Sequence, residues 1–242
     1  MDNRLHIANS QIVFSFRRNP EIRKRIFEFE DSLKDEFKIP FRSVAVPDDF
    51  DPNVPRFESQ SIHGHSRIQV SQTRITLASN YNELFKLDYN QVKEYILNKC
   101  NLTSKLVESE NMDFIAYVIE LGVYMKEDKT NTFIKENTGA IAINNDCRDF
   151  SLLYSKVYKS DFYLNVKCSK FTEQELVLHN ETKTLRPTGK LKHGISVVLD
   201  INTKPYFENN KKFEKGLYDK INKEVFDLIN TKRVESFLKG DI

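Results

Sequence analysis

Apolar and polar residues alternate in several stretches of the chain, a pattern typical of half-buried strands. The clearest case is a hairpin with apolar residues at positions 68, 70, 75 and 77 around a polar turn at Ser71–Arg74. The second half of the chain shows the same alternation at positions 195, 197, 199 and 201. We therefore expect antiparallel strands in both halves.

Each alternating stretch is followed by apolar residues spaced by three or four, which predicts a helix with one buried face. These residues are at positions 85, 89, 92 and 96 in the first half, and at 213, 217, 221, 225 and 228 in the second. Both stretches open with His-Gly-x-Ser, at His63 and at His193. The shared order predicts an internal duplication, with residues 61–99 and 192–229 superposing as strand followed by helix.

This pattern predicts the α+β class, as two similar lobes that are each an antiparallel sheet covered by helices. The stretch 101–111 is polar enough to connect them. We expect an N-terminal lobe over residues 1–105 and a C-terminal lobe over residues 106–242.

Further elements follow from local signals. Asn19-Pro20 predicts the start of a helix that Pro40 stops, and the prolines of residues 47–55 predict a rigid surface loop. A long buried strand is expected over residues 114–125. Helical spacing at positions 150, 153 and 157 favours a helix there, and Arg186–Gly189 predicts a turn into the last strand.

Composition narrows the class of protein. The 242 residues include 18 Phe, 10 Tyr and no Trp, and Lys plus Arg exceed Asp plus Glu by only two. A chain of this length buries roughly 70% of its unfolded surface, so a substantial core is expected. The near-neutral charge lacks the excess typical of a protein whose main task is neutralising phosphates.

Three separated cysteines, at positions 100, 147 and 168, suggest neither a disulfide framework nor a zinc site. They fit a reducing cytosol. The most apolar stretch, residues 114–125, is too short to span a bilayer. We expect a cytoplasmic protein without membrane contact.

A basic cluster around the start of the first helix is the first candidate site. It could contact phosphates or an acidic partner, although nearby acidic residues favour a solvated face with intrahelical ion pairs. Its members are Arg17, Arg18, Arg23, Lys24 and Arg25.

A second candidate site is a pair of histidines that alternate across Gly64. On a strand, His63 and His65 would point to the same face, where Asp48, Asp49 or Asp51 from the preceding loop could join them around a metal ion. Two solvated histidines on a hairpin are the commoner arrangement, so we expect no cofactor. We find no phosphate-binding glycine loop and no nucleophile elbow.

The segment Val197–Asn202 and the helix that ends at Val225–Arg233 resemble the end of an uncharacterised, sporadically distributed bacterial protein family of about 250 residues. The stretch from Tyr81 to Leu97 resembles its middle. Asn202 stands where that family pattern has a second aspartate. The resemblance implies a bacterial cytosolic protein from mobile or defence-related gene neighbourhoods, and it supplies no catalytic residues.

Duplication without a catalytic motif favours a non-enzymatic protein-interaction module, whose partner is another protein or a second copy of the chain. The alternative is a nucleic-acid-binding protein or a metal-dependent phosphodiester enzyme that uses His63, His65 and the acidic loop.

Overall fold

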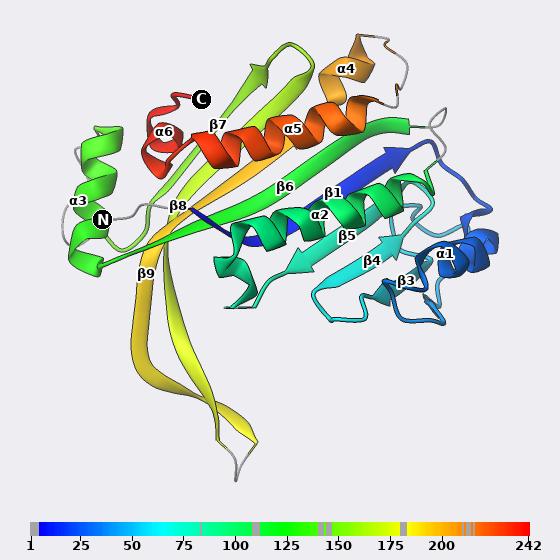
Figure 1. Cartoon of the computed structure of the whole chain (residues 1–242), viewed down its shortest axis with the longest axis horizontal. Coiled ribbons are helices and arrows are strands. Elements are labelled where there is room, and N and C mark those ends of the chain that lie inside the picture. Colours follow the sequence, from blue (N-terminus) through cyan, green and yellow to red (C-terminus); the bar gives the residue numbers. More distant parts are fainter. Residues whose placement is uncertain are drawn as a thin grey trace.

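A computed structural model describes residues 5–82, 84–107, 112–139, 143, 147–179, 183–209, 211, 214 and 216–242. Within these residues, nine strands form one sheet in the order β2-β3-β4-β5-β1-β6-β9-β8-β7 (Figure 1). Every neighbouring pair is antiparallel. The strands are β1 (His6–Phe16), β2 (Arg42–Ser43), β3 (Phe57–Gln60), β4 (Ser66–Val70), β5 (Arg74–Asn80), β6 (Met112–Met125), β7 (Ser151–Tyr158), β8 (Phe162–His179) and β9 (Thr184–Asn202).

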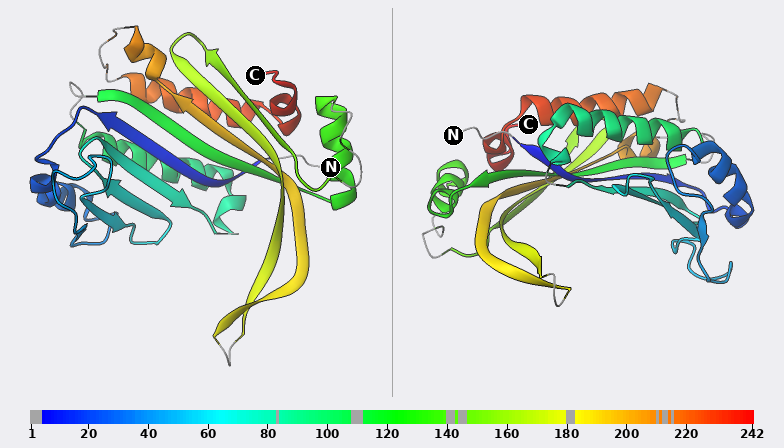
Figure 2. Two further views of the ribbon diagram at one scale, coloured as in Figure 1. Left: turned by 180° about the vertical axis from the view of Figure 1, so that it is seen from behind. Right: turned by 60° about the horizontal axis from the view of Figure 1, so that its bottom comes forward.

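Helices cover one face of this sheet. The two longest, α2 and α5, lie side by side over it, and from behind the strands lie in front of both (Figure 2). Leu217 and Ile221 of α5 are buried, as their spacing predicts. The helices are η1 (Ile22–Arg25), α1 (Ile26–Leu33), η2 (Phe85–Leu87), α2 (Tyr89–Ser104), α3 (Glu127–Thr138), α4 (Lys204–Glu208), α5 (Gly216–Thr231) and α6 (Val234–Lys239).

The prediction of two lobes, each with its own sheet, is wrong. β1 from the first half pairs directly with β6 from the second, from His6↔Gly122 to Phe16↔Met112, and one apolar cluster contains residues of both halves. Two separate sheets would each leave a long central edge unpaired, and pairing β1 with β6 removes both edges. The boundary expected near residue 105 lies between α2 and β6, but strands on its two sides share this sheet.

The His-Gly-x-Ser motif marks different places in the two halves. Gly64 lies in the turn before β4 with a positive φ of 77°, whereas Gly194 lies inside β9. Residues 61–99 contain two strands before α2, but residues 192–229 contain the end of one strand, then α4 and α5. The repeated string is therefore not a guide to equivalent positions.

Several local predictions are confirmed. The β4–β5 hairpin turns at Ser71–Arg74, β6 covers the predicted buried strand, and residues 47–55 form a surface loop without helix or strand. Arg56, fully buried, ties this loop by donating to the carbonyl oxygens of Phe50 and Val54. The first helix begins later than Asn19-Pro20 predicts, as the short helix η1 at Ile22 that continues into α1 at Ile26, and it ends at Leu33.

The helix favoured around residues 150–157 is a strand, β7. Its half-buried side chains are at positions 152, 154, 156 and 158, so the period is two, and Leu153 and Val157 lie on the exposed face. β-branched and aromatic residues at an edge strand outweigh three apolar positions with helical spacing.

The hairpin of β8 and β9 is much longer than local sequence signals indicate. Residues 162–168 and 175–178 read as two separate strands but belong to one strand, β8, and the predicted turn at Arg186–Gly189 lies within β9. The pairing register shifts between Gln174 and Leu176, opposite a β9 segment in which Gly189 has a φ of 78°. The residues predicted to form a turn therefore form an irregularity that bends the hairpin, and they do not mark the end of the hairpin.

Candidate functional site

The predicted basic cluster is used mainly to hold the first helix and its loop. The Arg23 guanidinium donates to Asp48 Oδ1 at 3.0 Å, to Ser43 Oγ at 2.9 Å and to the Val46 carbonyl oxygen at 2.8 Å. It also donates to the carbonyl oxygens of Val44 and Arg56. These hydrogen bonds connect η1 to the segment between β2 and β3, so the role of Arg23 is structural.

The neighbouring basic residues also have partners within the chain. Arg25 donates to both carboxylate oxygens of Glu28 at 2.7 Å and to the Leu106 carbonyl oxygen, Arg18 donates to Gln72, and Lys24 pairs with Glu21. The Arg25 contact holds the pKa of the Glu28 carboxyl below its usual range. The ion pairs expected on a solvated helix face are present.

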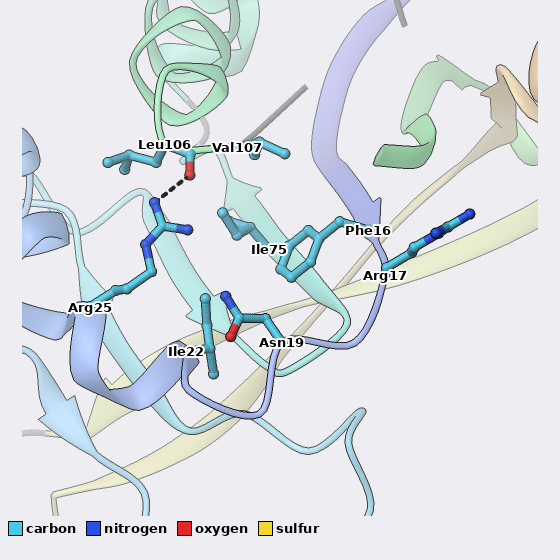
Figure 3. Close-up of a pocket in the computed structure, with 8 residues that line it drawn as sticks. All are labelled: Phe16, Arg17, Asn19, Ile22, Arg25, Ile75, Leu106 and Val107. Atoms are coloured by element: carbon cyan, nitrogen blue, oxygen red, sulfur yellow. Dashed lines mark hydrogen bonds between the residues drawn. The ribbon is translucent and has the colours of Figure 1, made fainter. Parts of the chain in front are cut away.

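A small pocket lies beside this cluster (Figure 3). It is formed by Phe16, Arg17, Asn19, Ile22, Arg25, Ile75, Leu106 and Val107. Arg25 points toward Leu106 and Arg17 points away. The cavity volume is about 20 Å³, which is room for about one water molecule. The pocket is too small to hold a phosphate group or a cofactor.

The structure does not bring the three predicted metal ligands together. His63 and His65 lie in the turn before β4, whereas the Asp48 carbonyl accepts a hydrogen bond from Gln72, in the turn after β4. A five-residue strand separates the two turns by roughly 17 Å. His65 instead packs against the rings of Phe85 and Tyr95. Among the described residues, no group of three or more His, Cys, Asp or Glu side chains could hold a metal ion.

The most unusual surface is the distal part of the β8–β9 hairpin, residues 172–179 and 184–192, here called the arm. It projects alone from the sheet and curves away from the face that α2 and α5 cover (Figures 1 and 2). None of its side chains joins the apolar core of the described residues. It nevertheless carries five apolar side chains that are each more than half exposed: Leu176, Val177, Leu178, Leu185 and Leu191.

Register places most of these side chains on one face of the arm. Leu176 lies opposite Pro187, and Leu178 lies opposite Leu185. Cross-strand partners point to the same face, and residues two apart along a strand do so too. The four residues therefore form a continuous apolar face that is open to solvent.

Two glycines shape the base of the arm. The Phe171 ring lies on Gly194, and a Cβ added to this glycine would be only 2.6 Å from the ring. The His6 ring lies on Gly122 in the same way, at 2.8 Å from an added Cβ. Tyr124 lies between them, stacked on His6 at 5.0 Å and edge-on to Phe171 at 5.7 Å. This aromatic cluster packs at the point where the arm leaves the sheet.

Lysines surround the same tyrosine. Lys86, buried itself, donates to the Tyr124 hydroxyl at 2.8 Å, and the Lys192 ammonium lies 5.5 Å from the ring centre. Burial raises the pKa of Tyr124, and the Lys86 hydrogen bond opposes that shift. The tyrosine therefore stays neutral and supports the arm as an aromatic platform.

Sequence reasoning missed the arm because each of its strands has a weak signal. Glu175–Leu178 reads as a short strand, and Pro187 and Gly189 read as a turn. The signal that could have identified the arm is the run from Thr182 to Leu199, which alternates and contains no acidic residue.

Comparison with known proteins supplies no family. No family model matches the chain, and a search of curated proteins finds no match. The resemblance to an uncharacterised bacterial family stays a prediction.

Proposed function

We propose that this protein is a non-enzymatic binding module that holds another protein through the arm. The observation that carries the proposal is the apolar face of Leu176, Leu178, Leu185 and Pro187, exposed on a hairpin arm whose side chains are not part of the apolar core of the described residues. Exposed apolar patches on folded proteins mark binding sites more often than scattered apolar residues do.

The energetics of the arm also favour a partner. An isolated two-stranded hairpin is marginally stable in water, so the arm gains order when its apolar face is covered. Fully burying one leucine side chain contributes about 1.5–3 kcal/mol, and the three leucines of this face are each still at least half exposed, so covering them contributes roughly half of that figure per leucine to holding a partner.

The alternative of a nucleic-acid-binding or phosphodiester enzyme has less support. Its proposed phosphate contacts, Arg23 and Arg25, already donate within the chain, and Asp48 is separated from His63 and His65 by the length of β4.

We further propose that the protein acts in a bacterial cytosol, in a system linked to mobile or defence genes. The cytosolic assignment is supported by Cys100, Cys147 and Cys168, which are all free thiols. No helix in the described part of the chain is long and apolar enough to cross a membrane. The link to mobile or defence genes rests on the family resemblance alone.

The test is affinity purification from the native host with wild type and with a Leu176→Ser/Leu178→Ser/Leu185→Ser variant. We expect the arm variant to fold normally and to lose a partner that wild type retains. A Phe27→Ser/Leu84→Ser variant removes two other exposed apolar side chains and serves as the matched control. Identical captured proteins from all three baits would contradict the proposal, and recovery of the chain itself as a dimer would identify a second copy as the partner.

A further inference from the structure

β7 forms one outer border of the sheet (Figure 1). It pairs with β8 over its whole length, from Ser151↔Ser169 to Tyr158↔Phe162, without a shift of register. On its other side, the described part of the chain places no strand. The opposite border is β2, which has only two residues. Of these two borders, β7 is therefore the one that is long enough to pair with a further strand.

The backbone groups along this edge alternate in direction. Lys170 donates its backbone N–H to the Phe150 carbonyl oxygen at 3.1 Å. Hydrogen-bonded pairs recur at every second position of an antiparallel ladder, so the even-numbered residues of β7 direct their backbone groups toward β8. The backbone groups that point away from the sheet belong to Ser151, Leu153, Ser155 and Val157.

The outer edge of β7 lacks the features that usually protect an edge strand, which are proline, a bulge or charged side chains. β7 contains no proline and no bulge, and Lys156 is its one charged residue. The Lys156 ammonium is held on the inner face, where it donates to the Ile242 carbonyl oxygen, and Tyr154 beside it donates to the Phe237 carbonyl oxygen at 2.9 Å. The edge is therefore open to strand pairing.

The outer face of β7 is uncharged and partly apolar. Leu153 is 68% exposed and Val157 is 59% exposed, and serines occupy the alternate positions 151 and 155. An added strand that placed apolar side chains beside these two residues would cover them.

β7 itself is such a strand. A two-fold axis at Ser155 pairs two antiparallel copies of β7 so that Leu153 lies opposite Val157 of the partner subunit and Ser155 lies opposite its own copy. The residues paired in this way are those whose backbone groups point outward, as the ladder requires. Moving the axis to Tyr154 would place Leu153 opposite Ser155 and Val157 opposite Ser151. The apolar match therefore specifies the axis at Ser155.

The neighbouring residues of β8 are compatible with this pairing. On the outer face, Lys167 lies beside Leu153, and Tyr163 lies beside Val157. Across the two-fold axis, each Lys167 is therefore in the same row as a tyrosine, and no like charges are placed opposite each other.

We infer that the protein forms a two-fold dimer through β7, in which the sheets of two copies join into one continuous antiparallel sheet. Pairing of one surface with its own copy is the commonest symmetry of protein oligomers. The inference goes beyond the proposed function. β7 pairs only with residues 162–169 of β8, so each subunit of the dimer keeps its arm free for the partner protein.

The test is analytical ultracentrifugation of the full chain over a wide range of concentrations. We expect wild type to reach twice the mass of the chain. Leu153→Lys/Val157→Lys places lysine opposite lysine at two positions of the dimer and should weaken dimerisation by about tenfold or more. Both side chains are exposed in the single chain, so the variant should fold, which circular dichroism checks.

The matched variant is Leu153→Lys/Val157→Glu. It changes the same two residues, but the two-fold axis at Ser155 now places each lysine opposite a glutamate, so we expect a dimer. A wild-type monomer at all concentrations would overturn the inference. Equal dissociation of Leu153→Lys/Val157→Lys and Leu153→Lys/Val157→Glu would also overturn it, because the predicted register makes the two variants differ.

The dimer and the arm are tested separately. A dimer that is lost in Leu176→Ser/Leu178→Ser/Leu185→Ser but persists in Leu153→Lys/Val157→Lys would overturn the inference, because the second copy would then occupy the arm. If the leucine variant still dimerises but loses the captured partner, both proposals are supported. If Leu153→Lys/Val157→Lys is a monomer and the leucine variant retains every captured protein, the dimer is supported and the proposed function is contradicted.

Discussion

The Phe171 ring lies directly over Gly194, its cross-strand partner at the base of the arm, with ring carbons 2.6 Å and 2.8 Å from where a Cβ would be. The same Cβ would be 2.2 Å from the Val123 carbonyl oxygen. The backbone of Gly194 is not in a left-handed conformation, so glycine is needed here for space. Since β6, β8 and β9 meet at this point, the contact couples the arm to the centre of the sheet.

Gly194→Ala should therefore destabilise the protein. Overpacking of this kind costs about 1–3 kcal/mol, because the added methyl group displaces both the ring and the neighbouring strand. Urea unfolding measures the change. Gly216→Ala is the matched control, since Gly216 starts α5 with nothing near its Cβ position. Equal stability of the two variants would mean that the base of the arm accommodates the added methyl group without a loss of stability.

The buried face of α5 gives a prediction about the core. Ile221 is fully buried, so Ile221→Asp places a carboxylate among apolar side chains and should lower the free energy of unfolding by about 4 kcal/mol. Lys223→Asp, on the exposed face of the same helix, should cost much less. Thermal unfolding compares them, and a wild-type melting temperature for Ile221→Asp would show that this face is not in the core.

The thiols should differ in reactivity. Burial raises the pKa of Cys100 to about 11 and that of Cys168 to about 12, so neither forms much thiolate at a pH of about 8. Cys147 is only partly buried. We expect a disulfide reagent to modify Cys147 first in the native protein and all three thiols after denaturation. Cys147→Ser should remove the fast phase, and a fast phase that persists would indicate that Cys100 or Cys168 is accessible.

Asp161 should make stability depend on acid pH. Hydrogen bonds from Lys211 and Lys220 lower the pKa of its carboxyl, so the unfolded chain binds a proton that the folded chain does not. The resulting stabilisation is fully present above the unfolded pKa of about 3.9 and is lost as the pH falls through the lowered value.

Asp161→Asn should therefore lower the melting temperature at a pH of about 6, with a difference that shrinks in acid. Asp113→Asn, at an exposed position of β6, is the control. Melting curves at several pH values test this expectation. A constant difference between Asp161→Asn and wild type at all pH values would mean that the two lysines do not act through this carboxylate.

The sequence predicted those elements whose periodic pattern agrees with their burial. The alternation around Ser71–Arg74 and the three-to-four spacing from Leu217 to Leu228 each describe one buried face, and both were placed correctly. The spacing of Leu153 and Val157 predicted a helix, and this prediction was wrong because both side chains lie on the exposed face of the edge strand β7.

The joining of the two halves could not be predicted from local patterns. It depends on the pairing of β1 with β6, between residues that are 96 (Phe16↔Met112) to 116 (His6↔Gly122) positions apart. The role of the basic residues could not be predicted from the sequence for a related reason. Arg23 is basic whether it binds phosphate or clamps a loop, and only the position of the Val44 and Val46 carbonyl oxygens distinguishes these roles.

Removal of the arm tests its proposed role most directly. Replacing residues 174–191 by Asn-Gly would join Glu173 to Lys192, which are already paired, through a two-residue hairpin turn. Because no arm side chain belongs to the apolar core, we predict an unchanged melting temperature together with complete loss of the partner captured by wild type. Capture of the same partner by the folded armless protein would contradict the assignment of binding to the arm.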